Sequence, residues 1–331
     1  MIYAPHTLEL TLETDTKKFN KLKDRAYKQS KGSNKMFSDK KKVGVHVDLA
    51  RKKEGMTVEY HDGIYKKRIR LIVNPTTMLG GNDIVKLWKP NESNISKLLS
   101  ALKSHIKDYF NSKYKLNDFA LTRMDFTVNI DVGSRDTVAA YIRILRNIGK
   151  VKGFAPKFDD DDDTINKANS FDLKGNSNDM EFTVYDKEGA SNKKEAKGIL
   201  RIEIRLMKPK AIRRATSAPD AVKQIRSLSL DSKPIFMTAF AHIVPRGDYY
   251  KKADVVKAIK ANVAKENSKN KMLELLELIP KKKSVYLAQK AMNDRNADKL
   301  MTMFAELNVS PVTISKRHDV KHLKSLYSYL L

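Results

Sequence analysis

The sequence predicts an α+β fold, in which a mainly antiparallel sheet is covered by helices and followed by a helical C-terminal part. Two observations lead to this prediction. Up to residue 209, segments with period-two alternation are interleaved with amphipathic helical segments, which is typical of α+β proteins. After Pro209 the apolar residues take helical spacing. We therefore expect an α+β domain over residues 1–231 and a helical domain over residues 232–331.

The expected strands follow in chain order from their alternation of apolar and polar residues. A turn at Asp62-Gly63 divides one expected hairpin, and a turn at Gly175-Asn176 divides another. The acidic run Asp159–Asp163 lacks the ligand spacing of a calcium loop, so we expect a solvated loop there. The expected strand segments are 7–12, 43–49, the hairpin 57–73, 123–132, the hairpin 170–187 and 200–206.

The expected helices follow from apolar residues spaced three and four apart. We expect Pro219, Pro234, Pro245, Pro280 and Pro311 to punctuate them. Residues 284–305 followed by 310–323 loosely resemble a helix-turn-helix, and interdomain packing is the alternative for this part. The expected helical segments are 94–110, 136–148, 219–229, 252–265, 271–279 and 284–305.

The charge of the chain indicates its class of partner. With 65 Lys and Arg against 39 Asp and Glu, the 331-residue chain carries a formal net charge of +26. Such a protein attracts polyanions, so nucleic acid is the expected partner. The absence of cysteine excludes disulfides, thiolate metal sites and a cysteine nucleophile. No apolar run approaches the roughly 20 residues that span a bilayer, and the first residues do not form a signal peptide. We expect a cytoplasmic protein without a membrane partner.

Three expected strands place chemically active side chains on one face. In residues 123–132, 181–187 and 200–206, alternate residues are apolar, and the others include Asp125, Glu203, Tyr185 and several basic side chains. A tyrosine can act as a covalent nucleophile, and phosphoryl transfer also needs carboxylate-bound cations and basic groups. The alternative is a solvated sheet face with cross-strand ion pairs.

Four motifs in order resemble the gene II/X family of phage and plasmid replication proteins, the initiators of filamentous-phage rolling-circle replication. They are VNPTTMLGG (73–81), LTRMDFTVNI (121–130), FTVYDKE (182–188) and GILRIEIRL (198–206). LNVSPVTISK (307–316) shows a weaker resemblance to a further segment of the same family. The resemblance implies an enzyme that nicks one strand of an origin through a phosphotyrosine, frees a 3′-hydroxyl for a polymerase, and later rejoins the strand.

The resemblance also implies site residues in this chain. The nucleophile falls on Tyr185, and Lys187 is expected to project from the same strand face. Asp125 and Glu203 are the expected metal ligands, and a carboxylate site favours Mg²⁺ or Mn²⁺. Many rolling-circle initiators use a histidine pair, which this chain lacks; His46-Val-Asp48 comes nearest, with a half-buried strand histidine as the alternative.

Several basic residues are expected to contact DNA phosphates. Basic clusters occur at 40–42, 51–53, 66–70, 208–214 and 281–283. Gly80-Gly81 is expected to be a turn, because no Gly-Lys-Ser/Thr follows it, and this absence also argues against a built-in helicase. The residues proposed for DNA binding are Arg123, Arg201, Arg205, Lys208, Lys210, Arg213 and Arg214.

Two other readings of function remain open from the sequence. One is a non-catalytic DNA-binding replication or maintenance protein, in which Tyr185 stacks or packs. The other is a mobilisation relaxase, which shares the chemistry. Tyr249-Tyr250 is the rival nucleophile pair, and it is expected to lie in a Pro/Gly/Lys-rich connector without carboxylates around it. As an initiator, the protein is expected in a bacterial cell, phage- or plasmid-encoded, with a host helicase and polymerase as partners.

Overall fold

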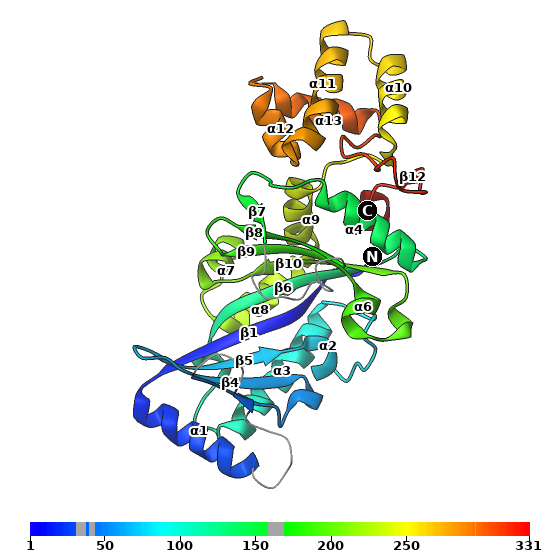
Figure 1. The fold of residues 1–331 in the computed structure, drawn as a ribbon. Helices are drawn as coiled ribbons and strands as arrows, with labels where there is room; N and C mark the ends of the chain where they lie inside the picture. The colour runs from blue at the N-terminus through cyan, green and yellow to red at the C-terminus, as the bar shows by residue number, and fades with distance from the viewer. Residues whose placement is uncertain (31–37, 40–43, 158–168, 295) are drawn as a thin grey trace. The chain divides into compact units, whose positions relative to one another are not determined.

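The computed structural model describes residues 1–30, 38–39, 44–157, 169–294 and 296–331 (Figure 1). The acidic run Asp159–Asp163 and the basic cluster at 40–42 lie outside the described residues. Among the described helices, none combines the length and the apolar character that crossing a bilayer requires.

The fold is α+β, with a ten-stranded sheet in the order β2-β3-β4-β5-β1-β6-β10-β9-β8-β7. Each strand pair with a described register is antiparallel. A short pair, β11 with β12, forms a second sheet. The strands are β1 (Ala4–Thr14), β2 (Ser38–Asp39), β3 (Val45–Asp48), β4 (Met56–Asp62), β5 (Lys67–Val73), β6 (Ala120–Asp131), β7 (Phe154–Pro156), β8 (Ser170–Gly175), β9 (Met180–Asp186), β10 (Ile199–Leu206), β11 (Tyr249–Tyr250) and β12 (His322–Leu323).

Helices cover the sheet and make up most of the C-terminal part (Figure 1). The long ones begin at side-chain caps: Asn91 accepts from Asn94 N at the start of α3, and Ser134 from Thr137 N at the start of α4. The helices are α1 (Thr16–Ser30), α2 (Pro75–Met78), α3 (Glu92–Tyr109), α4 (Arg135–Arg146), α6 (Lys187–Ser191), α7 (Pro209–Ala215), α8 (Ala221–Leu230), α9 (Ser232–Ile243), α10 (Lys252–Asn262), α11 (Glu266–Lys282), α12 (Val285–Ala291), α13 (Ala297–Glu306) and α14 (Tyr327–Leu330).

The chain forms two compact units, each made of separate chain segments. Unit 1 contains Met1 and residues 129–203 and 237–331, and unit 2 contains residues 2–128 and 204–236. The division passes through β6 and β10, so each of these strands contributes residues to both units. These compact units divide the chain at other positions than the domain boundary expected between residues 231 and 232. They do not test that boundary, which stays a prediction.

The core of unit 2 lies on the apolar face of β1. Leu8 and Leu10 alternate with polar residues along this strand, and both are fully buried. The apolar stripe of α3, which includes Leu98 and Leu102, is buried as well, and α8 contacts both α3 and β1. Burying a leucine side chain contributes about 1.5–3 kcal/mol, so these stripes hold the helices on the sheet. Their positions confirm the alternation expected for residues 7–12 and the helix expected for 94–110.

The core of unit 1 is built in the same way around β9. Phe182 and Val184 are fully buried on one face of this strand, and α4 contacts both β8 and β9. Phe240 of α9 packs against the Phe182 ring with a centroid separation of 6.3 Å. Both expected hairpins are present, since β4 pairs with β5 and β8 pairs with β9 in antiparallel register.

The C-terminal part corrects several expectations. The single helix expected over 284–305 is two helices, α12 and α13, because Asn293 takes a positive φ of 50° between them. Pro280 lies inside α11 instead of ending a helix. Residues 310–323 contain no helix, only the short strand β12, so the second helix of the loose helix-turn-helix resemblance is absent there.

A close backbone approach makes Gly149 a sharp test of the packing within unit 1. Its φ is +63°, and an added Cβ would lie 2.0 Å from the Lys283 carbonyl oxygen. Gly153 has φ +82° and no atom within 4 Å of such a Cβ. We expect Gly153→Ala to lower the free energy of unfolding by about 1–2 kcal/mol. Gly149→Ala should cost about 1–3 kcal/mol more because the backbone must shift. Denaturant unfolding measures both; equal losses would contradict the described contact.

Candidate functional site

Tyr185 lies on β9, on the face opposite the buried Phe182 and Val184. Its backbone pairs with Ser170 of β8. The phenol donates a hydrogen bond from Oη to Glu203 Oε1 at 2.8 Å. Tyrosine and carboxylate come from neighbouring strands, β9 and β10, and both belong to unit 1. The structure thus brings together two of the residues that the sequence predicts for the site.

The polar face of β10 is buried instead of solvated. Arg201 is 0% exposed and Glu203 is 4% exposed. Arg201 Nε donates to Asn129 Oδ1 of β6 at 2.7 Å, which satisfies part of this buried guanidinium. A solvated face with exposed ion pairs, the alternative from the sequence, is therefore wrong for this part of β10. Such burial of a charge is costly unless the charge is paired and hydrogen-bonded.

The surroundings of Tyr185 keep its phenol protonated at neutral pH. Burial raises the pKa of Tyr185 most, and the nearby Glu203 carboxylate raises it further. Arg201 acts in the opposite direction, because a guanidinium next to the phenol stabilises the phenolate. Tyr185 can therefore attack only if a base removes its proton, and Glu203 is already hydrogen-bonded to that proton.

Lys187 is placed differently from the expectation. It does not lie on the strand face, because β9 ends at Asp186 and Lys187 is the first residue of α6. The cause is local: the Asp186 side chain accepts from Glu188 N at 3.0 Å and caps the new helix. Lys187 is still close to the other site residues. Burial and the charge of Arg201 lower the pKa of Lys187 to about 8, and Glu203 opposes this shift.

We call Tyr185, Lys187, Arg201 and Glu203, together with Asn129, the tyrosine cluster. All of its members belong to unit 1. The cluster contains a phenol, a carboxylate that accepts its hydrogen bond, a cation beside the phenol and an amine with a lowered pKa, which are group types used in covalent and acid–base catalysis. Asn129 is the member whose role sequence reasoning missed, although the alternation of residues 123–132 already placed it on the polar face.

Asp125 lies in unit 2 and is held by guanidinium groups. Arg123 donates to both of its carboxylate oxygens, from Nε at 2.8 Å and from Nη2 at 2.6 Å. Arg205 Nε lies 3.9 Å from Asp125 Oδ2. The two predicted metal ligands, Asp125 and Glu203, belong to different units, so neither unit contains the pair.

The donor atoms of the predicted metal ligands are already engaged by other side chains. Within the described ranges, no group of three or more His, Asp or Glu side chains is arranged to hold one. Asp125 is bonded to Arg123, and Glu203 is bonded to Tyr185. For either carboxylate to bind Mg²⁺ or Mn²⁺, one of these donors has to move aside. The arrangement as described does not fit the metal, and its requirement stays a prediction.

The basic residues after β10 are arranged on α7. Helix α7 buries Ala211 and Ile212 on one side. Its predicted DNA-contacting residues are exposed on the other: Lys208, Lys210, Arg213 and Arg214. They lie in unit 2 at exposed positions, whereas Arg201 is fully buried and is better suited to act on the Tyr185 phenol.

The rival tyrosines lie in a different environment. Tyr249 is fully buried in β11 and its pKa is raised by burial, and Tyr250 stacks on His322 with ring centroids 4.6 Å apart. The sequence pattern predicts a connector without carboxylates around this pair. That prediction is wrong, because Asp248 directly precedes Tyr249 and its charge also raises the pKa of Tyr249. Tyr249 is thus a packed core residue.

His46 is half-buried on β3. Its neighbour Asp48 accepts hydrogen bonds from Tyr109 Oη at 2.6 Å and from Ala50 N at 2.8 Å. These bonds give Asp48 a structural role, which favours the half-buried strand histidine over metal ligation for His46-Val-Asp48.

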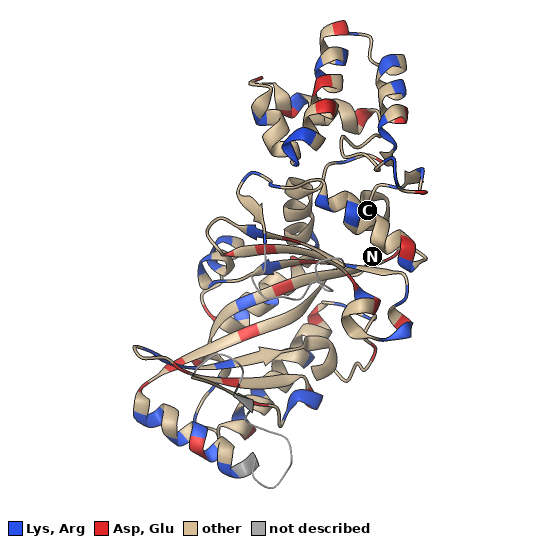
Figure 2. Ribbon diagram, viewed as in Figure 1, with Lys and Arg blue, Asp and Glu red and all other residues tan. Residues whose placement is uncertain are grey.

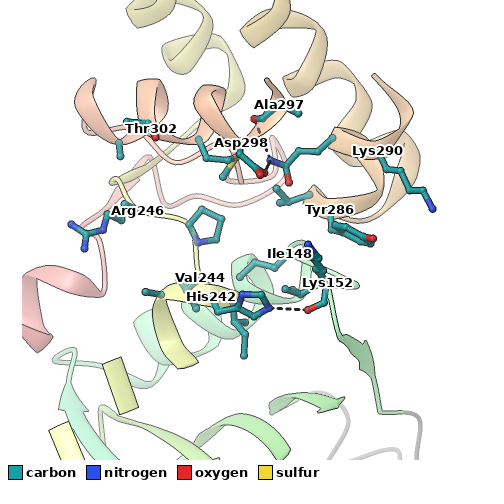
Figure 3. A pocket seen from close by; sticks show the side chains of 18 of the residues that line it. Ile148, Lys152, His242, Val244, Arg246, Tyr286, Lys290, Ala297, Asp298 and Thr302 are labelled. Carbon is teal, nitrogen blue, oxygen red and sulfur yellow. Dashed lines mark hydrogen bonds between the residues drawn. The ribbon is translucent and has the colours of Figure 1, made fainter. Parts of the chain in front are cut away.

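A cleft of about 1040 Å³ in unit 1 lies apart from the tyrosine cluster (Figure 3). His242 is hydrogen-bonded to the Lys152 carbonyl at 2.8 Å on one side of the cleft, and Asp298 and Tyr286 line it from α13 and α12. None of the predicted catalytic residues lines it. Its lining mixes acidic and basic side chains, which indicates no particular ligand.

Comparison with known proteins gives a similarity to solved structures. No family model and no curated protein matches the chain. The chain is similar to a solved structure described as a rolling circle replication initiator protein from Geobacillus stearothermophilus, over 96% of this chain and 99% of that chain. The two share 13% sequence identity with a TM-score of 0.39.

Proposed function

We propose that the protein initiates rolling-circle replication by nicking and rejoining one DNA strand at an origin, with Tyr185 as the nucleophile. The observation that carries this proposal is the 2.8 Å hydrogen bond from Tyr185 Oη to Glu203 Oε1, beside Arg201 and Lys187. It joins a potential nucleophile to a proton acceptor, which is the arrangement that covalent catalysis requires. The four sequence motifs that resemble gene II/X proteins support the same assignment.

The cluster contains a group for each proton transfer that the phosphoryl transfer requires. Tyr185 Oη forms a bond to the phosphorus as its proton passes to Glu203. The bond from phosphorus to the 3′-oxygen breaks, and Lys187 in its ammonium form protonates that leaving oxygen. Arg201 stabilises the negative charge on the phenol oxygen. The DNA keeps its 5′-phosphate on Tyr185 and gains a 3′-hydroxyl, and the reverse steps rejoin the strand.

Mg²⁺ or Mn²⁺ would supply charge neutralisation at the phosphate. The carboxylates predicted to bind it, Asp125 and Glu203, are engaged by Arg123 and Tyr185. A host helicase and a polymerase follow from the proposed reaction as partners, since the nicked duplex must be unwound and the 3′-hydroxyl extended.

The proposal is tested by incubating the protein with supercoiled DNA that carries the cognate origin. Nicked product together with a covalent protein–DNA adduct supports it. Binding without an adduct would favour the non-catalytic DNA-binding protein. A mobilisation relaxase would also give an adduct, but at a transfer origin.

Duplex binding should depend steeply on salt. The net charge of +26 and the exposed cations of α7 neutralise phosphates and release counterions. We expect the logarithm of the affinity to fall with the logarithm of the salt concentration with a slope of about −0.9 per phosphate neutralised. Fluorescence anisotropy between low and physiological salt measures it. A nearly flat dependence would remove the polyanion interpretation.

The pH dependence of cleavage should report on Lys187. Its pKa of about 8 means that the ammonium form, which protonates the leaving oxygen, is lost as the pH rises through 8. We expect single-turnover cleavage by the unsubstituted protein to fall above pH of about 8. Lys187→Met should cleave more slowly at neutral pH and lack this fall. If the variant retains the same alkaline fall, Lys187 is not the proton donor.

A further inference from the structure

Acidic and basic side chains alternate across five neighbouring strands of unit 2, where the ribbon shows both charges interleaved (Figure 2). We call these residues the carboxylate–guanidinium row. In spatial order its members are Glu59 on β4, Arg70 on β5, Glu9 on β1, Arg123 and Asp125 on β6, and Arg205 on β10.

Each contact in the row joins opposite charges. Arg70 lies between two carboxylates, with Nη1 3.8 Å from Glu59 Oε2 and Nε 3.5 Å from Glu9 Oε2. Arg123 joins Glu9 to Asp125, at 2.9 Å and 2.6 Å. Arg205 continues the row at 3.9 Å from Asp125. Glu9 and Asp125 are therefore each shared by two guanidinium groups.

Burial distinguishes the two kinds of residue in the row. The carboxylate side chains of Glu59, Glu9 and Asp125 are 5%, 10% and 2% exposed. The arginine side chains at positions 70, 123 and 205 are 34%, 21% and 22% exposed. The acids thus lie beneath, and the arginines reach solvent.

This arrangement is costly as a purely structural device, because desolvating carboxylates offsets much of the attraction that they gain. It has a clear use in binding. A guanidinium carries five N–H donors in a planar fork, and Arg123 uses three of them on Asp125 and Glu9, so two remain for a second acceptor. Phosphate oxygens match the spacing of the guanidinium donors. An arginine side chain that is already held by carboxylates loses less conformational entropy when it binds a phosphate.

We propose that the row is a preformed binding track for the sugar–phosphate backbone of single-stranded DNA. Arg70, Arg123 and Arg205 contact phosphates, while Glu9, Glu59 and Asp125 position them. The inference rests on the proposed function and extends it to Arg70 and to the buried acids. Strand spacing of about 4.8 Å separates β5 from β10 by about 14 Å, room for a short run of nucleotides. Because the arginine side chains are only 21–34% exposed, a flexible single strand can follow them more closely than a stiff duplex.

The chain offers a matched control for each side of the row. Arg68 lies two residues before Arg70 on β5, and Glu13 lies four residues after Glu9 on β1, so each shares a strand face with its counterpart. These two form an exposed ion pair, with Arg68 Nε 3.3 Å from Glu13 Oε1 and side chains 45% and 55% exposed. Substituting them removes the same charges from the same strands and leaves the row intact.

Binding of a short oligo-dT to the full chain carrying Tyr185→Phe tests the proposal, because this protein cannot form the proposed adduct. We expect Arg70→Gln to weaken binding about tenfold, as the loss of a charge-assisted hydrogen bond would, and to reduce the salt slope by about 0.7. Arg68→Gln should weaken it less than about threefold. Glu9→Gln should also weaken binding, although it removes a negative charge, whereas Glu13→Gln should leave it unchanged or tighter.

Equal effects of Arg70→Gln and Arg68→Gln, or tighter binding by Glu9→Gln, would overturn the track. Thermal unfolding shows whether a variant is folded. If Glu9→Gln does not fold, titrating the ¹⁵N-arginine-labelled Tyr185→Phe protein with oligo-dT gives the answer: the Nε–H signals of Arg70, Arg123 and Arg205 should shift more than that of Arg68. Binding is read here without cleavage, so a failed nicking assay would contradict the proposed function and leave this result standing.

Discussion

Tyr185→Phe is expected to abolish both nicking of supercoiled origin DNA and the covalent protein–DNA adduct. The substitution removes one hydroxyl, the proposed nucleophile, and with it a hydrogen bond to Glu203. The ring stays in place beside the same neighbours, so folding and most of the DNA affinity should be retained. Loss of cleavage by at least about 10³-fold is expected when an enzyme loses its covalent nucleophile. Gel electrophoresis of the plasmid and denaturing gels of the adduct measure the two outcomes.

The control is Tyr250→Phe, since Tyr250 is the partly accessible member of the rival pair. This variant should nick as the unsubstituted protein does. Full cleavage by Tyr185→Phe would refute the assignment and move attention to Tyr249 and Tyr250.

Glu203→Ala should have the second-largest effect, a strong suppression of cleavage with DNA binding retained or tightened. The carboxylate accepts the Tyr185 proton, and general base catalysis is worth about 10²–10⁴-fold. Its removal also takes a negative charge away from the path of the phosphate. Glu195→Ala is a matched control on an exposed site of the same unit. Cleavage by Glu203→Ala at the parental rate would remove this residue from the reaction.

Chelation separates the two roles predicted for Glu203. If a divalent cation is required, EDTA should stop cleavage by the unsubstituted protein, and Mg²⁺ or Mn²⁺ should restore it. If Glu203 acts as the base alone, EDTA should leave cleavage unchanged while Glu203→Ala still abolishes it.

The fold could be predicted from the sequence wherever one face of an element is uniformly apolar. Strand β6 and helix α3 have such faces, and both were predicted within a few residues. Helix α9 was missed because its residues, SKPIFMTAFAHI, are apolar on most sides and include Pro234 near the start. Helix α1 was missed because of its many lysines, although Phe19, Leu22 and Ala26 repeat on one buried side.

The sequence predicts which residues belong to the candidate site, but it does not predict how they are arranged. Alternation placed Tyr185 and Glu203 on polar strand faces, and the structure joins them. The change from strand to helix at Lys187 depends on the Asp186 cap, which alternation does not reveal. The row could not be predicted, because its contacts depend on the order of the strands: β1 lies between β5 and β6 in the sheet, far from its place in the chain.

Shared partners in the row also restrict how this sequence can change over evolutionary time. An ion pair with no third member among the described residues, such as Lys269 with Glu266, can exchange its charges through two substitutions that involve no other partner. Glu9 serves two arginines, and Asp125 serves two as well. A reversal at either position therefore creates two repulsions at once, and no single second substitution repairs both. The row should change as a block among homologues, whereas an exposed ion pair with no third partner should vary freely.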